Sequence, residues 1–464
     1  MTLKDLEKKT IAILGFGVEG IALAQYFLKH NIAFSVIDEK SLHELEKTGA
    51  DEQNILQKLQ AQKIPLLLGK QIDAETLHAF AVLFRSPGIS LHKAYLQNFP
   101  GEITSVTKFF FDNFPGKIIG VTGTKGKGTT ATLIYEMLKK AGMDVYLGGN
   151  IGAPPIAFLD ILSQTSLVVL ELSSFQLQDI QKSPHVAVML MVTQEHLQDF
   201  RGQNFHASKE EYHEAKRNIL RFQTSDDMAI LSSDYAVTKA SAAFTKGKIA
   251  FVSRFQPVDG CFVEDNEIVI RWNQQEERVI SIFDILLPGK HNLENVCAAV
   301  MAVYSLGVSV ADIAFVLKTF KGLAHRLELV REVAGVRYYD DSFSTVPETA
   351  IAAIEAFADP EILILGGSSK NSDFTGLGKV ISEAKNIKAI IGIGMEWPSI
   401  QATIANKNIP ILTGAKNMSE IIAAVQKVAK AGDVVLLSPA CASFDMFLNY
   451  KERGNLFKEA VNLL

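Results

Sequence analysis

The sequence is poor in cysteine and contains no long apolar run. Its three cysteines, Cys261, Cys297 and Cys441, have neither CxxC spacing nor an even count, which excludes a disulfide framework. No apolar stretch approaches the roughly 18 residues that a membrane-spanning helix needs. The N-terminal segment also lacks the charged and apolar regions of a signal peptide. We therefore expect a cytoplasmic protein without a membrane span.

The sequence also lacks a large excess of charge of either sign. The 46 Lys and Arg residues are balanced by 51 Asp and Glu residues, and the net charge of −5 excludes a general affinity for nucleic acid. Glycine (32) and proline (14) are too few for a collagen-like or largely disordered chain. At roughly 150 residues per domain, the 464 residues predict about three globular domains.

Short β-branched runs alternate with helical patterns along the chain. Such runs are typical of parallel strands buried on both faces, and the alternation predicts an α/β fold with doubly wound sheets. We expect strands at Thr10–Leu14, Lys117–Gly120, Leu167–Leu170, Ile362–Leu365, Lys388–Ile391 and Val434–Leu437. We expect helices at Gly20–His30, Thr129–Ala141, Asn292–Leu306, Val310–Phe320, Pro347–Phe357 and Ser419–Lys430.

Two restarts of the strand–glycine pattern mark domain boundaries. The first lies at Lys117 and the second near Gly322–His325, which predicts domains at residues 1–106, 107–322 and 323–464. Within the middle domain, the stretch Asp226–Arg278 has more alternation and more polar turns than the rest. We expect this stretch to be rich in strands.

The first glycine loop fits the pattern GxGxxG between a strand and a helix. It reads Gly15-Phe16-Gly17-Val18-Glu19-Gly20, and Asp38 follows 18 residues later at the end of another predicted strand. Glycines in this pattern allow a tight turn and a close approach of the backbone to a diphosphate at a helix N-terminus. Taken alone, the loop is compatible with a nicotinamide dinucleotide, with another nucleotide or with none.

The second glycine loop follows the predicted strand at Lys117–Gly120. It reads Gly123-Thr124-Lys125-Gly126-Lys127-Gly128-Thr129-Thr130, and backbone N–H groups in such a loop wrap phosphates while a lysine reaches the β and γ oxygens. In the usual pattern a hydroxyl that binds Mg²⁺ follows the lysine directly, whereas Gly128 stands there in this chain. A nucleotide-phosphate loop remains the favoured interpretation over a solvated basic turn.

With both loops on one chain, the sequence resembles the Mur ligases, and within them the branch that adds glutamate. The resemblance covers nearly the whole chain. It is carried by Gly15–Gly20, Ser86–Gly88, Gly120–Thr130, Gly148–Gly152, Glu171–Leu177, His291–Asn295, Ala324–Glu328, Asp340–Thr345, Gly366–Phe374, Ser438–Phe447 and Arg453–Phe457. It implies a Rossmann-like N-terminal domain for a UDP substrate, a P-loop-type central domain for ATP with a mostly parallel sheet, and a Rossmann-like C-terminal domain for glutamate.

The resemblance implies an ATP-dependent amide ligase of peptidoglycan precursor synthesis that acts through an acyl phosphate. Its substrates would be ATP, UDP-N-acetylmuramoyl-L-alanine and glutamate, with Mg²⁺ or Mn²⁺ as metal, and we expect a monomer. The residues that would bind ATP are Gly123, Thr124, Lys125, Gly126, Lys127, Gly128, Thr129, Thr130, Asn295, Arg326 and Asp341. The residues that would serve catalysis are Lys127, Glu171, His196 and Lys216, with Lys216 carrying a carbamate. Thr129, Glu171, His196 and Lys216 would hold the metal.

The other two substrates also have matching positions. The resemblance assigns the UDP substrate to Phe16, Gly17, Val18, Glu19, Gly20, Asp38, Ser86, Pro87, Gly88 and Asn150. It assigns glutamate to Thr345, Lys370, Ser443 and Tyr450. This revises the nicotinamide interpretation, because the first loop would hold a UDP group. A folylpolyglutamate synthetase would lack the first domain, and a nicotinamide dehydrogenase would leave the second loop unexplained.

Some positions depart from the family pattern. Gly128 replaces the metal-binding hydroxyl, and the segment around His196 has its acids shifted to Glu195 and Asp199. Phe343 stands where relatives carry a lysine near the amino-acid pocket. An apolar ring there would change which glutamate isomer fits, so addition of L-glutamate instead of D-glutamate remains an alternative. A non-catalytic homologue is a second alternative, opposed by the presence of Lys127, Glu171 and the other expected site residues.

Overall fold

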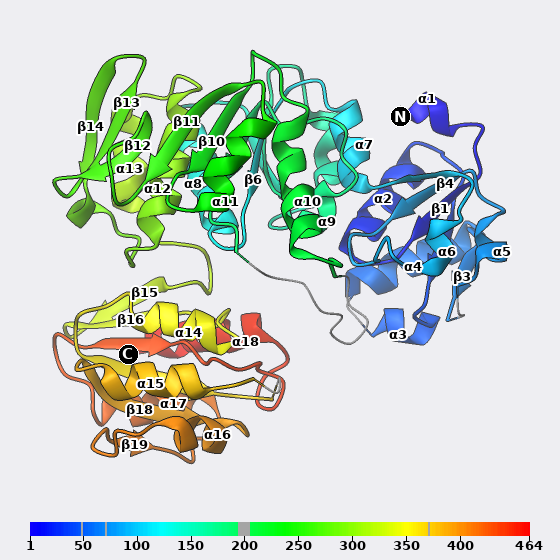
Figure 1. Ribbon diagram of the computed structural model, residues 1–464. Coiled ribbons are helices and arrows are strands. Elements are labelled where there is room, and N and C mark those ends of the chain that lie inside the picture. The colour runs from blue at the N-terminus through cyan, green and yellow to red at the C-terminus, as the bar shows by residue number, and fades with distance from the viewer. Residues whose placement is uncertain (48–49, 70–71, 194–204, 370–371) are drawn as a thin grey trace. The chain divides into compact units, whose positions relative to one another are not determined.

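The computed structural model describes the chain except for residues 48–49, 70–71, 194–204 and 370–371. The chain forms two compact units. Met1–Ile280 and Glu294–Val316 make the first, and Ser281–Leu293 and Leu317–Leu464 make the second. The units hold three mostly parallel sheets with helices between the strands, so the predicted α/β class is confirmed (Figure 1). The expected domain boundaries at residues 106 and 322 stay predictions.

The N-terminal sheet has five parallel strands in the order β3-β2-β1-β4-β5. The strands are β1 (Ile11–Leu14), β2 (Ser35–Asp38), β3 (Leu66–Leu68), β4 (Val82–Arg85) and β5 (Glu102–Thr104). The helices are α1 (Leu3–Leu6), α2 (Val18–Lys29), α3 (Leu42–Glu46), α4 (Ala50–Ala61), α5 (Ala74–Leu77), α6 (Ala94–Gln97) and α7 (Val106–Asn113). The strand order reverses between β1 and β4, which is where open α/β sheets bind ligands.

The central sheet has nine strands in the order β14-β13-β12-β11-β10-β9-β6-β8-β7. The strands are β6 (Lys117–Thr122), β7 (Val145–Gly149), β8 (Leu167–Glu171), β9 (Val186–Met189), β10 (Met228–Ser232), β11 (Lys248–Ser253), β12 (Gly260–Glu264), β13 (Glu267–Trp272) and β14 (Gln275–Ser281). Five of them fall between Asp226 and Ser281, which confirms the predicted strand-rich stretch. The pairs from β7 to β12 are parallel, and β12 pairs with β13 antiparallel.

Helices of two kinds accompany the central sheet. The α-helices are α8 (Lys127–Lys140), α9 (Ser174–Leu177), α10 (Lys209–Arg221), α11 (Ala236–Ala240), α12 (Asn292–Tyr304) and α13 (Val310–Thr319). The 3-10 helices of the first unit are η1 (Pro155–Ile161) and η2 (Ser241–Phe244), and η3 (Ile282–Asp284) belongs to the second unit. In the described part of the chain, no helix is both long enough and apolar enough to cross a membrane.

The C-terminal sheet has six strands in the order β15-β16-β20-β17-β18-β19. The strands are β15 (Glu328–Val333), β16 (Val336–Asp340), β17 (Glu361–Gly366), β18 (Ile387–Ile393), β19 (Ile411–Leu412) and β20 (Val434–Leu437). Its helices are α14 (Pro347–Ile354), α15 (Thr375–Glu383), α16 (Trp397–Thr403), α17 (Met418–Gln426) and α18 (Tyr450–Asn462). β15 pairs antiparallel with β16, and the other strands are parallel.

Apolar strands buried on both faces explain this architecture. Alternate side chains of a strand point to opposite faces, so a continuous apolar run needs a helical layer on each side. In the C-terminal sheet, Leu363 and Leu436 belong to one core with α14, α15 and α16, while Ile362 and Val435 belong to another with α17 and α18. The carboxyl ends of the parallel strands remain for loops, which places the expected site residues at those edges.

Candidate active site

The second glycine loop joins β6 to α8 and has the backbone shape that binding a phosphate requires. Gly126 is in the left-handed region with φ of +86°, and α8 begins directly after it at Lys127. A Cβ on Gly126 would overlap the side-chain oxygen of Asn295, so glycine is required there on two grounds. The first turn of α8 therefore directs backbone N–H groups toward the loop, where they can donate to an anion.

Lys127 lies over this loop. Its ammonium group donates to the carbonyl oxygens of Gly123 (3.0 Å) and Thr124 (2.9 Å). Thr129 is half-exposed in the first turn of α8, whereas the hydroxyl of Thr130 is buried and has no hydrogen-bond partner among the described residues. Lys125 is exposed and Gly128 is buried. The structure thus brings the expected loop residues together around one helix N-terminus.

Glu171 lies beside this loop, at the carboxyl end of the neighbouring strand β8. Its Oε1 atom accepts a hydrogen bond from the Asn150 amide at 3.2 Å, and the Glu171 carbonyl accepts the Asn150 N–H at 2.9 Å. Its Oε2 atom is buried and, in the described part of the chain, has no hydrogen-bond partner. A buried carboxylate oxygen without a donor is costly unless a cation or water meets it, so Glu171 fits a hard divalent cation such as Mg²⁺.

Lys216 reaches the same loop from α10. Its side chain is 2% exposed, and its ammonium group donates to the carbonyl oxygen of Gly123 at 2.8 Å and to the Thr122 hydroxyl at 3.4 Å. The ring of Tyr212, one turn earlier on α10, lies 4.7 Å from that ammonium group. The structure therefore brings Lys216, Lys127 and Glu171 to one edge of the central sheet, from elements far apart in the sequence.

The first glycine loop meets a second expected segment at the point where the N-terminal strand order reverses. A Cβ on Gly15 would lie 2.8 Å from the Cβ of Ser86, so the loops after β1 and β4 are in contact. Asp38 at the end of β2 accepts the Phe16 N–H at 2.6 Å and the Lys40 N–H at 2.8 Å. Its carboxylate therefore fixes the backbone of the loop that is expected to bind UDP.

Other members of this set differ in exposure. Val18 is exposed, and Pro87 and Gly88 lie in the turn after β4. Glu19 accepts a hydrogen bond from the Gln176 amide at 2.7 Å, and burial raises the pKa of the Glu19 carboxyl to about 7. Glu19 thus connects the first loop with the segment Glu171–Leu177 of the central sheet domain.

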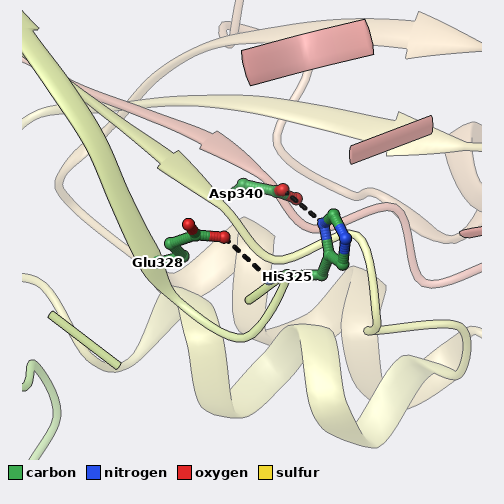
Figure 2. Close-up of side chains that lie close together, drawn as sticks. All are labelled: His325, Glu328 and Asp340. Carbon is green, nitrogen blue, oxygen red and sulfur yellow. Dashed lines mark hydrogen bonds and ion pairs between the residues drawn. The ribbon is translucent and has the colours of Figure 1, made fainter. Parts of the chain in front are cut away.

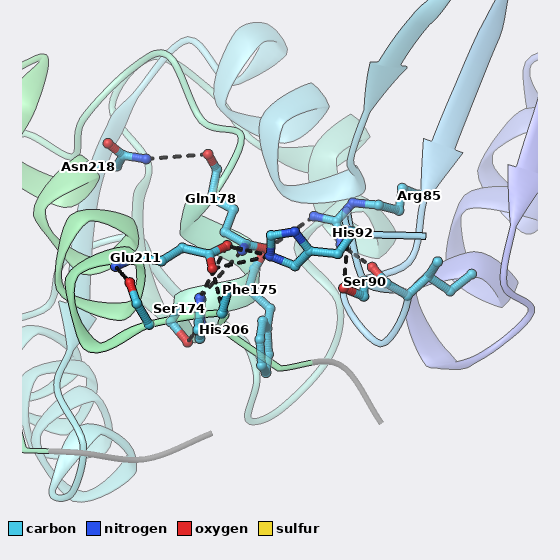
Figure 3. Close-up of polar contacts among 12 residues, drawn as sticks. Arg85, Ser90, His92, Ser174, Phe175, Gln178, His206, Glu211 and Asn218 are labelled. Atoms are coloured by element: carbon cyan, nitrogen blue, oxygen red, sulfur yellow. Dashed lines mark hydrogen bonds and ion pairs between the residues drawn. The ribbon is translucent and has the colours of Figure 1, made fainter. Parts of the chain in front are cut away.

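A buried arginine, Arg85, supports the turn that holds Ser86–Gly88. Its guanidinium group donates to the carbonyl oxygen of Ile89 at 2.6 Å, and it reaches the Phe175 carbonyl and the Asp179 carboxylate at 3.4 Å each (Figure 3). Its side chain is fully buried. Arg85 therefore ties the turn to the segment that follows Glu171. The sequence signal for this role was an arginine ending the apolar run Val82–Phe84.

Figure 3 also shows a polar network around Glu211, at the start of α10. Its carboxylate lies 2.9 Å from His92 Nε2 and accepts the Gln178 amide at 3.3 Å. His206, which is buried, lies 2.9 Å from the Ser174 hydroxyl and stacks on the Phe175 ring. None of these residues was expected as a site residue, and they connect the N-terminal sheet domain with the helix that bears Lys216.

In the C-terminal sheet domain, Arg326 and Tyr450 both lie next to Phe343. The Arg326 guanidinium carbon lies 3.9 Å from the centre of the Phe343 ring, and the Tyr450 ring meets that ring edge-on at 5.2 Å. Asp341 is buried and accepts hydrogen bonds from the Leu327 N–H and from the hydroxyl groups of Ser344 and Ser438. Burial raises the pKa of the Asp341 carboxyl to about 7. The expected contact of Asp341 with a ribose stays a prediction.

The expected glutamate residues come from loops at neighbouring strand ends. Thr345 follows β16 and Ser443 follows β20, while Tyr450 begins α18. Arg453, which was not expected, is fully buried between these loops and donates to the Ser342 hydroxyl and to the carbonyl oxygens of Ser342, Cys441 and Ala442. Its signal in the sequence was its place at the start of the motif Arg453–Phe457, to which no role at the site was assigned.

Two of the expected residues lie outside the described residues. They are His196, expected at the metal, and Lys370, expected at a glutamate carboxylate. The remaining expected residues gather at the carboxyl edges of the three sheets, in the two units separately.

Comparison with protein families gives three consecutive matches. The Mur ligase MurD-like N-terminal domain matches residues 9–106, the Mur ligase middle domain matches residues 121–303, and the Mur ligase glutamate ligase domain matches residues 325–441.

Individual relatives agree with these families. The UDP-N-acetylmuramoylalanine–D-glutamate ligase of Acetivibrio thermocellus is 38% identical over 471 residues, covering 99% of this chain and 97% of the relative. The enzyme of that name from Symbiobacterium thermophilum is 36% identical, covering 98% of both chains. Among solved structures, MurF ligase of Thermotoga maritima with ADP matches with a TM-score of 0.57 at 19% identity, covering 99% of this chain and 96% of that one. The last likeness concerns the fold alone.

Proposed function

The chain belongs to the Mur ligase family, and we propose that it is an ATP-dependent ligase that joins D-glutamate to UDP-N-acetylmuramoyl-L-alanine. The observation that carries the proposal is the loop Gly123–Thr130 at the start of α8, with Lys127 over it and a buried carboxylate oxygen of Glu171 beside it. A helix N-terminus with a lysine is suited to hold a polyphosphate, and the Glu171 carboxylate oxygen would bind the metal that accompanies it. The two relatives named above support the choice of substrates.

The proposed reaction has two steps. A carboxylate oxygen of the muramoyl-alanine substrate attacks the γ-phosphorus of ATP, so that a P–O bond to the acyl group forms and ADP leaves. The amino group of glutamate then attacks the acyl carbon, phosphate leaves with its electron pair, and the nitrogen loses a proton as the amide forms. The loop N–H groups and Lys127 hold the phosphates and stabilise the charge that develops on them.

Glu171, Thr129 and His196 are the residues we assign to Mg²⁺ or Mn²⁺, together with a carbamate on Lys216. The metal would neutralise the phosphate oxygens during transfer. A carbamate forms when the Lys216 ammonium group loses one proton, the neutral nitrogen bonds to CO₂ and a second proton is released. The carbamate replaces an ammonium group by an anionic oxygen pair. Because the Lys216 nitrogen lies 2.8 Å from the Gly123 carbonyl, such a group would lie under the phosphate loop.

The remaining assignments follow the sequence positions. We assign the UDP substrate to the loops after β1 and β4 with Asp38 and Asn150, and the nucleotide also to Asn295, Arg326 and Asp341. We assign glutamate to Thr345, Lys370, Ser443 and Tyr450. The proposal places the enzyme in the bacterial cytoplasm, where it acts as a monomer.

Phosphate release tests the proposal directly. Purified protein is incubated with ATP, Mg²⁺ and UDP-N-acetylmuramoyl-L-alanine, and either D-glutamate or L-glutamate is added. We expect phosphate release that requires D-glutamate, with a product heavier than the nucleotide substrate by one glutamyl residue. Release with L-glutamate alone would favour the other glutamate-adding branch, and no release with either isomer would favour a non-catalytic homologue.

Lys127→Ala tests the phosphate-loop assignment. We expect ADP formation to fall by at least about a thousandfold, because the variant lacks the ammonium group that neutralises the transferred phosphate. Lys139→Ala, in the exposed last turn of the same helix, is the matched control and should retain activity. Turnover by Lys127→Ala at the wild-type rate would reject the assignment.

A further inference from the structure

Phe343 has a definite place in the C-terminal sheet domain. Its ring lies under the guanidinium group of Arg326, with the guanidinium carbon 3.9 Å from the ring centre. The residue as a whole is 38% exposed to solvent. Tyr450 meets the same ring edge-on at 5.2 Å. A cation over the face of an aromatic ring is attracted by the ring quadrupole, so the pair restricts where the arginine side chain points.

The backbone around Arg326 is restricted as well. His325 and Leu327, on either side of it, are both in the left-handed region, with φ of +63° and +47°. Side chains disfavour this region, and the conformation persists only where contacts hold it. The turn that bears Phe343 is fixed to the same segment, because the Phe343 N–H donates to the His325 carbonyl at 3.0 Å.

Three acidic side chains hold His325 and Leu327 in this conformation. His325 Nδ1 lies 2.7 Å from an Asp340 carboxylate oxygen, and the His325 N–H donates to Glu328 at 2.9 Å (Figure 2). The Leu327 N–H donates to Asp341 at 3.1 Å. The cluster of His325, Glu328 and Asp340 is therefore engaged in hydrogen bonds.

The same cluster has donors that resemble a metal site, but its contacts argue against one. The Glu328 oxygen that accepts the His325 N–H also lies 3.0 Å from the Lys458 ammonium group. The second Asp340 oxygen accepts the Ser342 N–H at 2.9 Å. A cation in this place would meet a lysine and would break the hydrogen bonds that support the left-handed segment.

We propose that Phe343 is a positioning residue for Arg326, holding its guanidinium group ready for the nucleotide. The argument rests on the proposed function, in which Arg326 contacts ATP. A long arginine side chain loses rotamer freedom when it binds an anion, and a ring that already holds it removes part of that loss. A lysine at position 343 would place a second cation beside Arg326, whereas the phenyl ring attracts the guanidinium group. Tyr450 in turn fixes the ring from the side of the expected glutamate pocket.

The test is a double-mutant cycle between Phe343 and Arg326, read as KM for ATP, KM for glutamate and kcat. Phe343→Leu keeps an apolar side chain but removes the ring, and we expect KM for ATP to rise about threefold to fivefold with kcat nearly unchanged. Phe343→Tyr keeps a ring and should retain the wild-type KM for ATP. Phe343→Lys should raise KM for ATP more than Phe343→Leu does. Phe255→Ala removes a different ring, one that lies under Arg254 in the central sheet domain, and serves as the control.

The Arg326→Ala variants distinguish a failure of the positioning role of Phe343 from a failure of the proposed nucleotide contact. Arg326→Ala should raise KM for ATP about tenfold or more, and no change there would reject the nucleotide contact itself. In the Arg326→Ala background, Phe343→Leu should change KM for ATP less than twofold. Equal effects of Phe343→Leu in both backgrounds, or none in either, would overturn the positioning role while the nucleotide contact stands. Thermal unfolding of each variant verifies that it folds.

Discussion

Burial shifts the pKa of single side chains in this protein. Burial raises the pKa of the Asp341 carboxyl and the Glu19 carboxyl to about 7 each, although hydrogen bonds from Ser344 and from Gln176, respectively, oppose the shift. Desolvation outweighs these hydrogen bonds because a charged carboxylate loses more solvation than neutral donors restore. A carboxyl in such a place is partly protonated near neutral pH, so its role depends on what approaches it.

The single substitution Lys216→Ala tests the proposed carbamate. The variant removes the nitrogen that lies 2.8 Å from the Gly123 carbonyl, and we expect at least a hundredfold loss of kcat, since the proposed anionic metal ligand is gone. Added short-chain carboxylates should restore part of the activity by occupying the vacated space. Lys209→Ala, at the exposed start of the same helix, is the control. Full activity of Lys216→Ala without an additive would reject the carbamate.

Glu361, at the start of β17, gives a stability prediction that depends on pH. Burial raises the pKa of its carboxyl to about 8, and its Oε2 atom has no hydrogen-bond partner among the described residues. The unfolded chain ionises this group near its ordinary value of 4.5, so unfolding releases a proton between pH 4.5 and about 8. The wild-type free energy of unfolding therefore falls as pH rises through that range.

Glu361→Gln removes this ionisation. At pH 5 the variant and the wild type should have similar free energies of unfolding, and by pH 8 the variant should be more stable by roughly 3 kcal/mol. Urea unfolding at both pH values measures the difference, with Glu383→Gln on the exposed surface as control. A difference that stays constant from pH 5 to pH 8 would contradict the prediction.

At the scale of elements, loops that leave neighbouring strands are held by side chains from a third element. Arg453 on α18 joins the loop after β16 to the loop after β20 through backbone carbonyl oxygens. Burial lowers the pKa of its guanidinium group to about 10, yet the group stays charged at neutral pH. Because these loops bear Thr345 and Ser443, we expect the arginine to support the proposed glutamate pocket.

Arg453→Met should therefore lower both stability and affinity for glutamate. The carbonyl oxygens of Cys441 and Ala442 lose their donor in a buried place, and we expect about 3 kcal/mol less free energy of unfolding. KM for glutamate should rise, while KM for the UDP substrate should stay near the wild-type value. Urea unfolding and steady-state kinetics measure these effects, with the exposed Arg331→Met as control. Unchanged stability would show that the loops do not depend on this clamp.

Strands were easier to predict than helix ends. The expected strand at Val434–Leu437 matches β20, because an uninterrupted β-branched run leaves few alternatives. The helix expected from Thr129 begins two residues earlier, at Lys127, since the left-handed Gly126 ends the loop there. Which side chains would meet at the strand ends did not follow from these local patterns.

At the scale of the whole molecule, the first unit joins two sheet domains through buried polar contacts. Arg85 from β4 reaches Phe175 and Asp179, 90 and 94 residues away in the sequence, and Glu19 meets Gln176. The apolar core is also continuous, because Phe84 and Phe109 belong to the same buried cluster as Val168 and Met189. The proposed UDP site is therefore built from both sheet domains.

Arg85→Met tests this connection. The substitution keeps an apolar stem but removes the donors to Ile89, Phe175 and Asp179, which leaves the Asp179 carboxylate with the Ser105 hydroxyl but without its cationic partner. We expect KM for the UDP substrate to rise about tenfold, and the free energy of unfolding of the first unit to fall by about 3 kcal/mol. The exposed Arg278→Met, in the β13–β14 hairpin, is the control. An unchanged KM for the UDP substrate would show that the Ser86–Gly88 turn keeps its place without Arg85.

The sequence by itself determined the strands, the two glycine loops and the family, because each depends on residues that are close together in the chain. Apolar runs form strands, and glycines allow the backbone that a phosphate requires. Only the tertiary structure decided which side chains meet: Arg326 with Phe343, Arg85 with Phe175, and Glu171 with Asn150. The reason is physical, since strand order sets which loops are neighbours, and burial then decides which polar groups must pair.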